Sequence, residues 1–385
     1  MQKTVNKSTG ESTLQRSSNL ELFRIITMLL IIAHHYVVNS GLMSADGPMS
    51  ANPLAFNTVF LWLFGAWGKT GINCFVLITG YFMCRSKITV KKFMKLLLEI
   101  MFYKIAIYAI FLITGYVQFS ADGLIRALLP LYSVAQNFPG CFLLFYLLIP
   151  FLNIALQHMN ERQHLRLVVL LGFIYVILGS VFGANVQFNY VTWFVVLYFV
   201  AAYVRMYPKA LFDNTRLWAA LAAGTLLICV ACILGFHFLG QKIKVVNGYS
   251  LMTDSNKILA FAAAFCGFMF FKNVNIKQSR FINTVAASVF GVLLIHSGSA
   301  QMRTLVWVDI LQVTQVYESP FMIVHAFFSI IAIFTVCTVI DYLRIRFLEK
   351  PFFAMWDKKW PVLKAAYTEK ENKICEKLGI DLTDK

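Results

Sequence analysis

The feature of this sequence that most constrains its fold is a series of apolar runs of about twenty residues, which recur along almost the whole chain. A helix rises 1.5 Å per residue, so about twenty residues cross a hydrocarbon core of roughly 30 Å. Only 14% of the 385 residues are charged, against about 25% in soluble domains. Barrel strands would alternate apolar and polar residues, which these runs do not. The chain is therefore expected to be an all-α, polytopic integral membrane protein.

Ten of these runs are predicted to span the membrane. They cover residues 20–40, 55–83, 95–117, 139–157, 165–184, 190–207, 216–238, 256–273, 284–302 and 320–346. The second run is too long for one simple span and contains Lys69 and Asn73, so a tilted or broken helix is expected there. The membrane domain (19–352) is flanked by a polar N-terminus (1–18) and a charged tail (353–385), and the tail is predicted to be an amphipathic helix.

The distribution of basic residues predicts how the spans are oriented, because Lys and Arg collect on the cytoplasmic side. With ten spans, one side holds both termini and 27 of the 34 Lys and Arg residues, and the other side holds five. Both termini are thus expected in the cytoplasm. The net charge of +16 follows from this topology and suits anionic lipid headgroups, so it is no sign of nucleic-acid binding. A basic inner rim would equally suit an anionic cofactor.

The eight cysteines lie mostly within the apolar runs and predict neither a disulfide framework nor a zinc site. Cys229 and Cys232 have CxxC spacing, but they stand in a continuous apolar helix without a second pair. Small apolar packing residues are the simplest interpretation. No metal cofactor is expected.

The most informative stretch is the first apolar run, where Arg24 and His35 are eleven residues apart. Eleven steps of 100° end about 20° past three full turns, so the two side chains share one helix face, roughly 16 Å apart along the axis. Ionisable residues inside a span usually face a bundle interior or a wet cavity. His34 lies on a different line of the helix, and the spacing alone leaves open which of the two histidines acts.

Two ordinary explanations compete with a functional one. Arg24 can anchor the helix at the inner surface, and His35 can form a hydrogen bond between helices. In the functional interpretation, an imidazole in a cavity accepts a proton from a hydroxyl. An arginine at the rim binds a phosphate in forked geometry. Together they suggest a group that is carried by a phosphorylated cofactor and delivered to an alcohol.

An arginine, ten residues and a histidine in the first helix resemble the signature of membrane acyltransferase family 3, which Arg24 and His35 match by position. Further similar segments are residues 73–82, 146–153, 192–198 and 288–296. The resemblance implies transfer of an acyl group from cytoplasmic acyl-CoA, usually acetyl-CoA, to sugar hydroxyls of cell-envelope polysaccharides. It also implies a location in the cytoplasmic (inner) membrane. A polysaccharide exporter of the same fold, without bond chemistry, is the alternative.

The residues after the second span depart from the family's pattern. Many members carry paired arginines there, whereas this chain has the basic residues Arg85, Lys87, Lys91, Lys92 and Lys95. Together with Arg24, they are expected to hold the phosphates of acyl-CoA, the lysines as point charges. The segment 137–142 before the fourth span also lacks the acidic residue of many members, which leaves open how the acceptor hydroxyl is activated.

Four polar residues are candidates for the acceptor side, namely His34, Lys69, Asn73 and His296. Each has an ordinary explanation as well: a buried histidine with satisfied hydrogen bonds, or a helix break at the membrane interface. The mechanism that the resemblance favours uses His35 as general base for an acceptor hydroxyl, or as a transient carrier of the acyl group.

Overall fold

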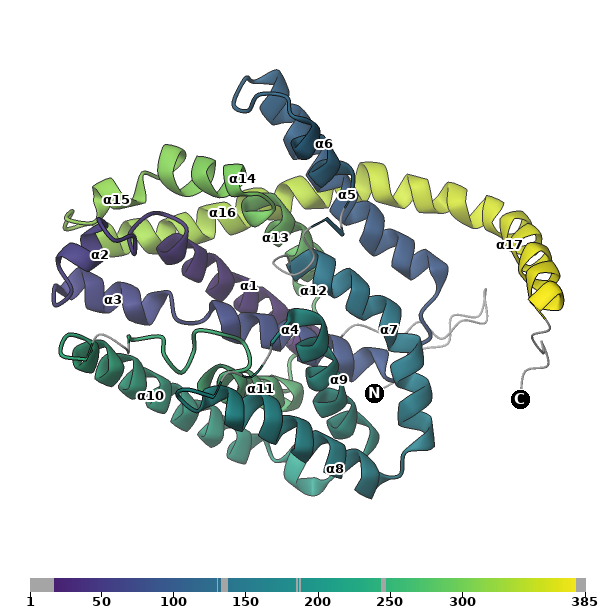
Figure 1. The fold of residues 1–385 in the computed structure, drawn as a ribbon, viewed down its shortest axis with the longest axis horizontal. Coiled ribbons are helices and arrows are strands. Elements are labelled where there is room, and N and C mark those ends of the chain that lie inside the picture. The colour runs from purple at the N-terminus through teal and green to yellow at the C-terminus, as the bar shows by residue number, and fades with distance from the viewer. Residues whose placement is uncertain are drawn as a thin grey trace. The chain divides into compact units, whose positions relative to one another are not determined.

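The computed structural model describes residues 17–129, 131–132, 138–184, 186, 188–243 and 247–378. All regular structure in that part of the chain is helical, as the sequence predicts (Figure 1). The polar segment 1–16 and the end of the predicted tail (379–385) lie outside the described residues. The chain divides into two compact units, Met1–Thr338 and Val339–Lys385.

The first unit is a bundle of α-helices with a few short π- and 3₁₀-helical segments, which are labelled η. In chain order its elements are α1 (Ser18–Val38), α2 (Pro48–Ala51), α3 (Phe56–Phe64), α4 (Gly68–Met83), α5 (Val90–Ile113), α6 (Ala121–Leu128), α7 (Phe138–His158), α8 (Glu161–Leu171), η2 (Gly172–Leu178), α9 (Tyr190–Met206), η3 (Ala210–Asp213), α10 (Thr215–Gly240), α11 (Ile258–Asn273), α12 (Arg280–Ala287), α13 (Val289–Ser297), α14 (Ala300–Thr304), η4 (Leu305–Ile310), α15 (Val313–Val316) and most of α16 (Met322–Arg344).

Seven helical stretches within the described residues are long and apolar enough to cross a membrane. They are Ser18–Val38, Phe56–Met83, Val90–Ile113, Phe138–His158, Thr215–Gly240, Arg280–Ser297 and Met322–Val362. The shorter apolar helices α9 and α11 and the continuous pair α8–η2 occupy the positions of three further predicted spans. The protein is therefore an all-helical, polytopic membrane protein, and about ten crossings fit its helices.

Hydrogen bonds between helix ends define one end of the bundle, here called the proximal end because α1 begins there. The side-chain amide of Asn19 donates to the main-chain oxygens of Lys272 and Val274, at the end of α11. Arg205, at the end of α9, donates to the Tyr81 hydroxyl near the end of α4. Helices α4, α9 and α11 thus finish where α1 starts, as alternating spans require.

A second set of hydrogen bonds defines the opposite, distal end, where α1 finishes. His237 at the end of α10 contacts the main-chain oxygen of Pro53, just before α3, at 2.8 Å. Lys257, at the start of α11, donates to the main-chain oxygen of Gly179 after η2. The connections at the two ends therefore alternate along the chain.

The second predicted span is broken, as its polar residues indicate. Helix α3 ends at Phe64, α4 begins at Gly68, and the three residues between them form a turn. The main-chain carbonyl of Gly65, in this turn, accepts a hydrogen bond from the ring of His34. An interrupted span of this kind is tolerated where the freed backbone groups are satisfied within the protein.

The core of the first unit lies around α4 and α9, at the centre of the bundle (Figure 1). Trp193, Phe194 and Tyr198 of α9 are completely buried. Trp193 also donates through its indole N–H to Asn73 of α4, 2.7 Å away, and Asn73 donates in turn to the main-chain oxygen of Ser255. These bonds join α4, α9 and the loop before α11, and they satisfy both the oxygen and the nitrogen of the buried Asn73 amide.

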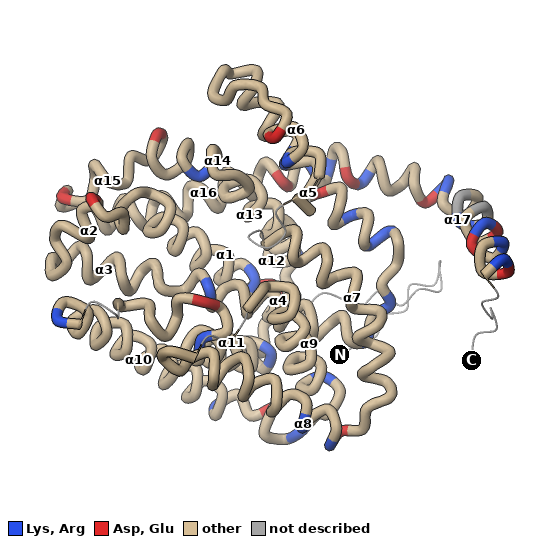
Figure 2. Tube along the Cα trace, in the orientation of Figure 1, with Lys and Arg blue, Asp and Glu red and all other residues tan. Residues whose placement is uncertain are grey.

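The second unit contains the end of α16, η5 (Ile345–Glu349) and α17 (Lys350–Leu378). Arg344 is the centre of a buried ion cluster, 2.7 Å from Asp341 and 2.9 Å from Glu349. Figure 2 shows that charged residues are sparse along the helices of the first unit, whereas α17 carries many charges of both signs. The described part of the predicted tail (353–378) is thus helical and lies within α17.

Candidate active site

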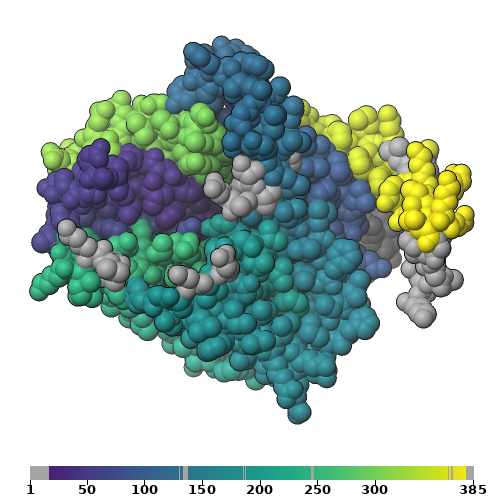
Figure 3. Space-filling view, in the orientation of Figure 1, coloured from purple at the N-terminus to yellow at the C-terminus, as the bar shows by residue number. Residues whose placement is uncertain are grey.

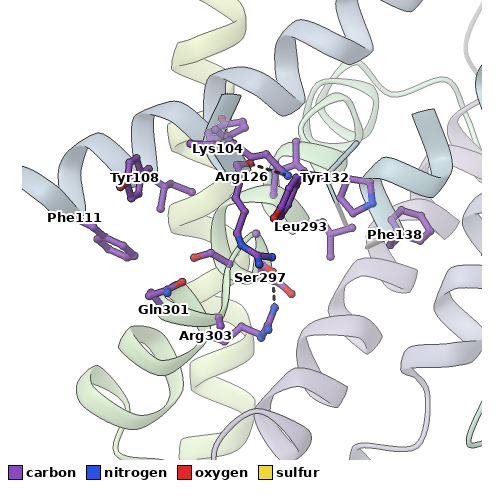
Figure 4. Close-up of a pocket in the computed structure, with 18 of the residues that line it drawn as sticks. Lys104, Tyr108, Phe111, Arg126, Tyr132, Phe138, Leu293, Ser297, Gln301 and Arg303 are labelled. Atoms are coloured by element: carbon purple, nitrogen blue, oxygen red, sulfur yellow. Dashed lines mark hydrogen bonds between the residues drawn. The ribbon is translucent and has the colours of Figure 1, made fainter. Parts of the chain in front are cut away.

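A cavity of about 780 Å³ is present in the first unit at the distal end of the bundle (Figure 4). Its wall is formed by α1, α4, α5, α6, α13 and α14, with contributions from α7 and α9. Figure 3 shows that α6, one wall of the cavity, projects from the surface of the unit next to α5. The cavity is large enough for a sugar-sized ligand, since ligand sites typically measure about 300–1,000 Å³.

His35 lines this cavity and is the first member of a hydrogen-bonded chain. Its Nδ1 lies 2.9 Å from Nε2 of His296 on α13. Nδ1 of His296 lies 2.6 Å from the main-chain oxygen of Val292, one turn earlier on the same helix. The two rings are 5.1 Å apart between centroids, and His296 is buried.

The carbonyl at the end of this chain fixes where the protons of both neutral rings lie. A carbonyl oxygen can only accept, so Nδ1 of His296 carries a proton and its Nε2 is an acceptor. Nδ1 of His35 must then donate to that acceptor, which leaves Nε2 of His35 without a proton. His35 is thereby held in the tautomer of a general base, with its basic nitrogen free of protein partners in the described part of the chain.

His34 also lines the cavity, but it is fixed by the break between α3 and α4. Its Nδ1 lies 2.6 Å from the main-chain oxygen of Gly65. Its ring lies so close to Gly68 that a Cβ atom there would be 2.3 Å from ring carbons. Only glycine fits at this contact. The helix break is therefore shaped around His34 and holds that ring beside His35.

Lys69, another residue predicted from the sequence, lines the cavity together with His34 and His35. It lies in the first turn of α4. Its ammonium donates to the Tyr190 hydroxyl at 2.9 Å and lies 3.9 Å from Asp254. Together with Arg303, it is near enough to act electrostatically on His35. A cation beside a general base can stabilise the negative charge that develops on a reacting oxygen.

Three cavity cations were not among the residues that the sequence singles out, namely Lys104, Arg126 and Arg303. They come from the consecutive helices α5 and α6 and from α14, which is far from both in sequence. Figure 4 shows the side chains of Arg126 and Arg303 pointing toward the same part of the cavity, beside Ser297. Two features of the sequence could have indicated these cations as site residues. Lys104 interrupts an apolar span, and Arg303 follows His296 by seven positions.

Arg24 is not part of the cavity wall. It is half-buried near the proximal end and forms an ion pair with Glu21, with 3.4 Å between the charged groups. It precedes His35 by eleven positions on the helix, or about 16 Å of axial rise. The arginine and the histidine of the first helix therefore belong to opposite ends of the bundle.

The basic cluster after the second span also lies at the proximal end. Its members, Arg85, Lys87, Lys91, Lys92 and Lys95, are exposed in the α4–α5 loop and the first turns of α5. Lys92 donates to the Ser86 hydroxyl and to the main-chain oxygen of Lys87. None of the five lines the cavity, so the structure brings them together with one another and not with His35.

Asn73 does not line the cavity, although it lies one turn after Lys69. It is fully buried, and its side chain bridges Trp193 and the backbone of Ser255. The expectation that Asn73 faces the acceptor is therefore wrong for this structure, because its amide is used to join three segments of the core.

A small void of about 20 Å³ lies beyond the inner wall of the cavity. It shares Phe138 and Leu293 with the cavity and is otherwise lined by Met28 and other apolar side chains. Met28 is one turn beyond Arg24 on α1, so the void lies between the level of Arg24 and that of His35. The path along this face of α1 is apolar.

Comparison with known proteins identifies the class. The profile of acyltransferase family 3, described as an acyltransferase domain, matches residues 17–342, which include the cavity and both ends of the bundle. The chain therefore belongs to acyltransferase family 3 and is a membrane acyltransferase. No curated protein and no solved structure matches the chain.

Proposed function

We propose that this protein transfers an acyl group, most simply acetyl, from CoA to a sugar hydroxyl of a cell-envelope polysaccharide. The observation that carries the proposal is the chain from the Val292 carbonyl through His296 to His35, which leaves a basic nitrogen at the wall of a sugar-sized cavity. General bases act on hydroxyls from this kind of position.

The orientation follows from the distribution of charge. The proximal end carries the basic cluster of the α4–α5 loop and most of the other Lys and Arg residues, so it faces the cytoplasm. Both termini are then cytoplasmic, and the cavity opens at the outer face of the cytoplasmic membrane. Acyl-CoA is a cytoplasmic donor and the polysaccharide is an outer acceptor, so the two substrates approach His35 from opposite ends.

The donor binds at the proximal end through its phosphates. Arg24 binds one phosphate in forked geometry, and the basic cluster supplies point charges for the others. The pantetheine arm runs along the apolar face of α1, past Met28 and the small void, toward His35. This route requires the apolar side chains around the void to move apart when the donor enters.

The reaction is a direct transfer. Nε2 of His35 takes the proton from the acceptor hydroxyl, and the hydroxyl oxygen attacks the thioester carbonyl carbon. The carbon–sulfur bond then breaks, the ester remains on the sugar, and the CoA thiolate takes up the proton from His35. Lys69, which lies near His35, stabilises the oxyanion that forms between these steps.

The test is release of CoA from acetyl-CoA by the purified protein in nanodiscs, with and without envelope polysaccharide. His35→Ala should lower turnover by about 10²- to 10⁴-fold, the usual contribution of a general base. His158→Ala is the matched control, because His158 is exposed at the end of α7, away from the cavity. Full transfer by folded His35→Ala would remove His35 from the mechanism.

A further inference from the structure

The cavity carries an excess of positive charge. Four cations line it, Lys69, Lys104, Arg126 and Arg303, and among the wall residues that the structure describes only Asp122 carries a negative charge. A concave site with charge of one sign concentrates ligands of the opposite sign. The excess is located at the distal end, where the acceptor enters in the proposed function.

Two of these cations already have carboxylate partners. Arg126 is 2.6 Å from Asp122 on the next turn of α6, and Lys69 is 3.9 Å from Asp254. The hydrogen bond from Arg126 lowers the pKa of Asp122, which favours the ionised form of this carboxylate. Their charges are at least partly compensated within the protein.

The other two cations have no carboxylate partner within the described residues. Lys104 donates to the main-chain oxygen of Arg126 at 3.4 Å, and Arg303 donates to that of Ser297 at 3.2 Å. Both side chains are half-buried. Lys104 also lies within electrostatic reach of the positive charge of Arg126. Half-buried cations without a counter-charge are costly, and an anion from the ligand would offset that cost.

The rest of the wall suits a sugar ring. Tyr103, Tyr108, Tyr132 and Phe138 line the cavity, and three of them are labelled around Lys104 in Figure 4. Aromatic faces pack against the C–H faces of sugar rings, while charged groups at the rim select the substituents. The wall thus combines surfaces for sugar rings with two cations that have no carboxylate partner within the described residues.

We propose that the acceptor is an acidic glycan, whose anionic groups bind between Lys104 and Arg303 while a neighbouring hydroxyl reaches His35. This inference rests on the proposed function, which identifies the cavity as the acceptor site. It adds the chemical class of the acceptor, a sugar chain that carries anionic groups. Carboxylate and phosphate groups share this chemistry, and a phosphorylated probe distinguishes them.

Binding alone tests this inference, because it needs no acyl transfer. The probes are tetragalacturonate, its neutral methyl ester, which keeps the same ring hydroxyls, and glucose 1-phosphate. The protein is held in nanodiscs of phosphatidylcholine, which has no net charge. We expect the free acid to bind at least tenfold more tightly than its ester, and tenfold corresponds to about 1.4 kcal/mol. Tighter binding of glucose 1-phosphate than of the uronate would assign the anionic group of the acceptor to phosphate, and tighter binding of the uronate would assign it to carboxylate.

The variants identify the residues responsible. Lys104→Gln and Arg303→Gln should each lower the ratio of acid to ester affinity by about three- to tenfold, and Arg303→Lys should keep most of it. Lys242→Gln is the control, since Lys242 is an exposed distal cation outside the cavity wall. Equal binding of acid and ester, or an unchanged ratio in both Gln variants, would overturn the inference.

The outcomes separate this inference from the proposed function. Preference for the acid without any turnover of acetyl-CoA would contradict the proposed function and leave the anionic site intact. Turnover with no preference for the acid would contradict the anionic site alone. If Lys104→Gln raises the KM for acetyl-CoA and leaves the acid-to-ester ratio unchanged, these cations bind the donor's phosphates and the inference is wrong.

Discussion

The hydrogen bond from His35 to His296 gives a quantitative prediction for catalysis. Replacing His296 by Leu removes the acceptor of the Nδ1–H of His35, which lies 2.9 Å from His296 Nε2. A buried N–H left without a partner costs about 1–3 kcal/mol. Each 1.4 kcal/mol is a factor of ten, so the productive tautomer of His35 loses about five- to 150-fold in population. We expect kcat to fall by this factor.

Replacing His296 by Gln is the matched control, because a side-chain amide both accepts and donates. Its oxygen can accept from His35 while its nitrogen donates to the Val292 carbonyl. His296→Gln should therefore retain much more of kcat than His296→Leu, and neither variant should change the KM for acetyl-CoA. The assay is CoA release at saturating acetyl-CoA, on variants that remain monodisperse in detergent. The reasoning is refuted if folded His296→Leu keeps the wild-type kcat, or if the Gln variant loses as much as the Leu variant.

Three further substitutions test other parts of the account. Gly68→Ala should lower CoA release at least tenfold because its Cβ would overlap the adjacent histidine ring, whereas Gly224→Ala, which has open space around it, should have no effect. Asn73→Ala leaves two buried partners without hydrogen bonds and should lower the free energy of unfolding in detergent by about 2–6 kcal/mol; unchanged stability would contradict its bridging role. Arg24→Ala should raise the KM for acetyl-CoA about tenfold with little change in kcat, and Arg162→Ala, an exposed proximal cation, should leave both constants unaltered.

Much of the fold could be predicted because the length and hydropathy of a sequence segment are enough to identify a helix that crosses a lipid bilayer. Length and hydropathy locate the helices to within a few residues, and Lys69 and Asn73 indicate the break in the second span. Helical periodicity also places Arg24 and His35 on one face. It cannot show that a separation of about 16 Å puts them at opposite ends of the bundle, with only one of them in a cavity.

The rest of the site depends on contacts between distant segments. His296 was a candidate by resemblance, but its bond to His35 joins residues 261 positions apart. Lys104 and Arg303 acquire a common role only because α5 and α14 line the same cavity. Asn73 shows why a polar residue in a span is a poor predictor of a site. Such a residue can line a cavity, or it can form hydrogen bonds with a neighbouring helix, and only the three-dimensional packing distinguishes the two roles.

The most direct test of the central claim, that His35 joins a cytoplasmic donor to an outer acceptor, uses sealed proteoliposomes. Acetyl-CoA is membrane-impermeant and is supplied on one side only, while protease access to the exposed α4–α5 loop reports which side carries the proximal end. The account predicts that CoA is released only when acetyl-CoA is on the side of the α4–α5 loop, and that His35→Ala abolishes this release. Release from acetyl-CoA supplied on the side of the cavity and α6 would contradict it, because that end would then be the donor site.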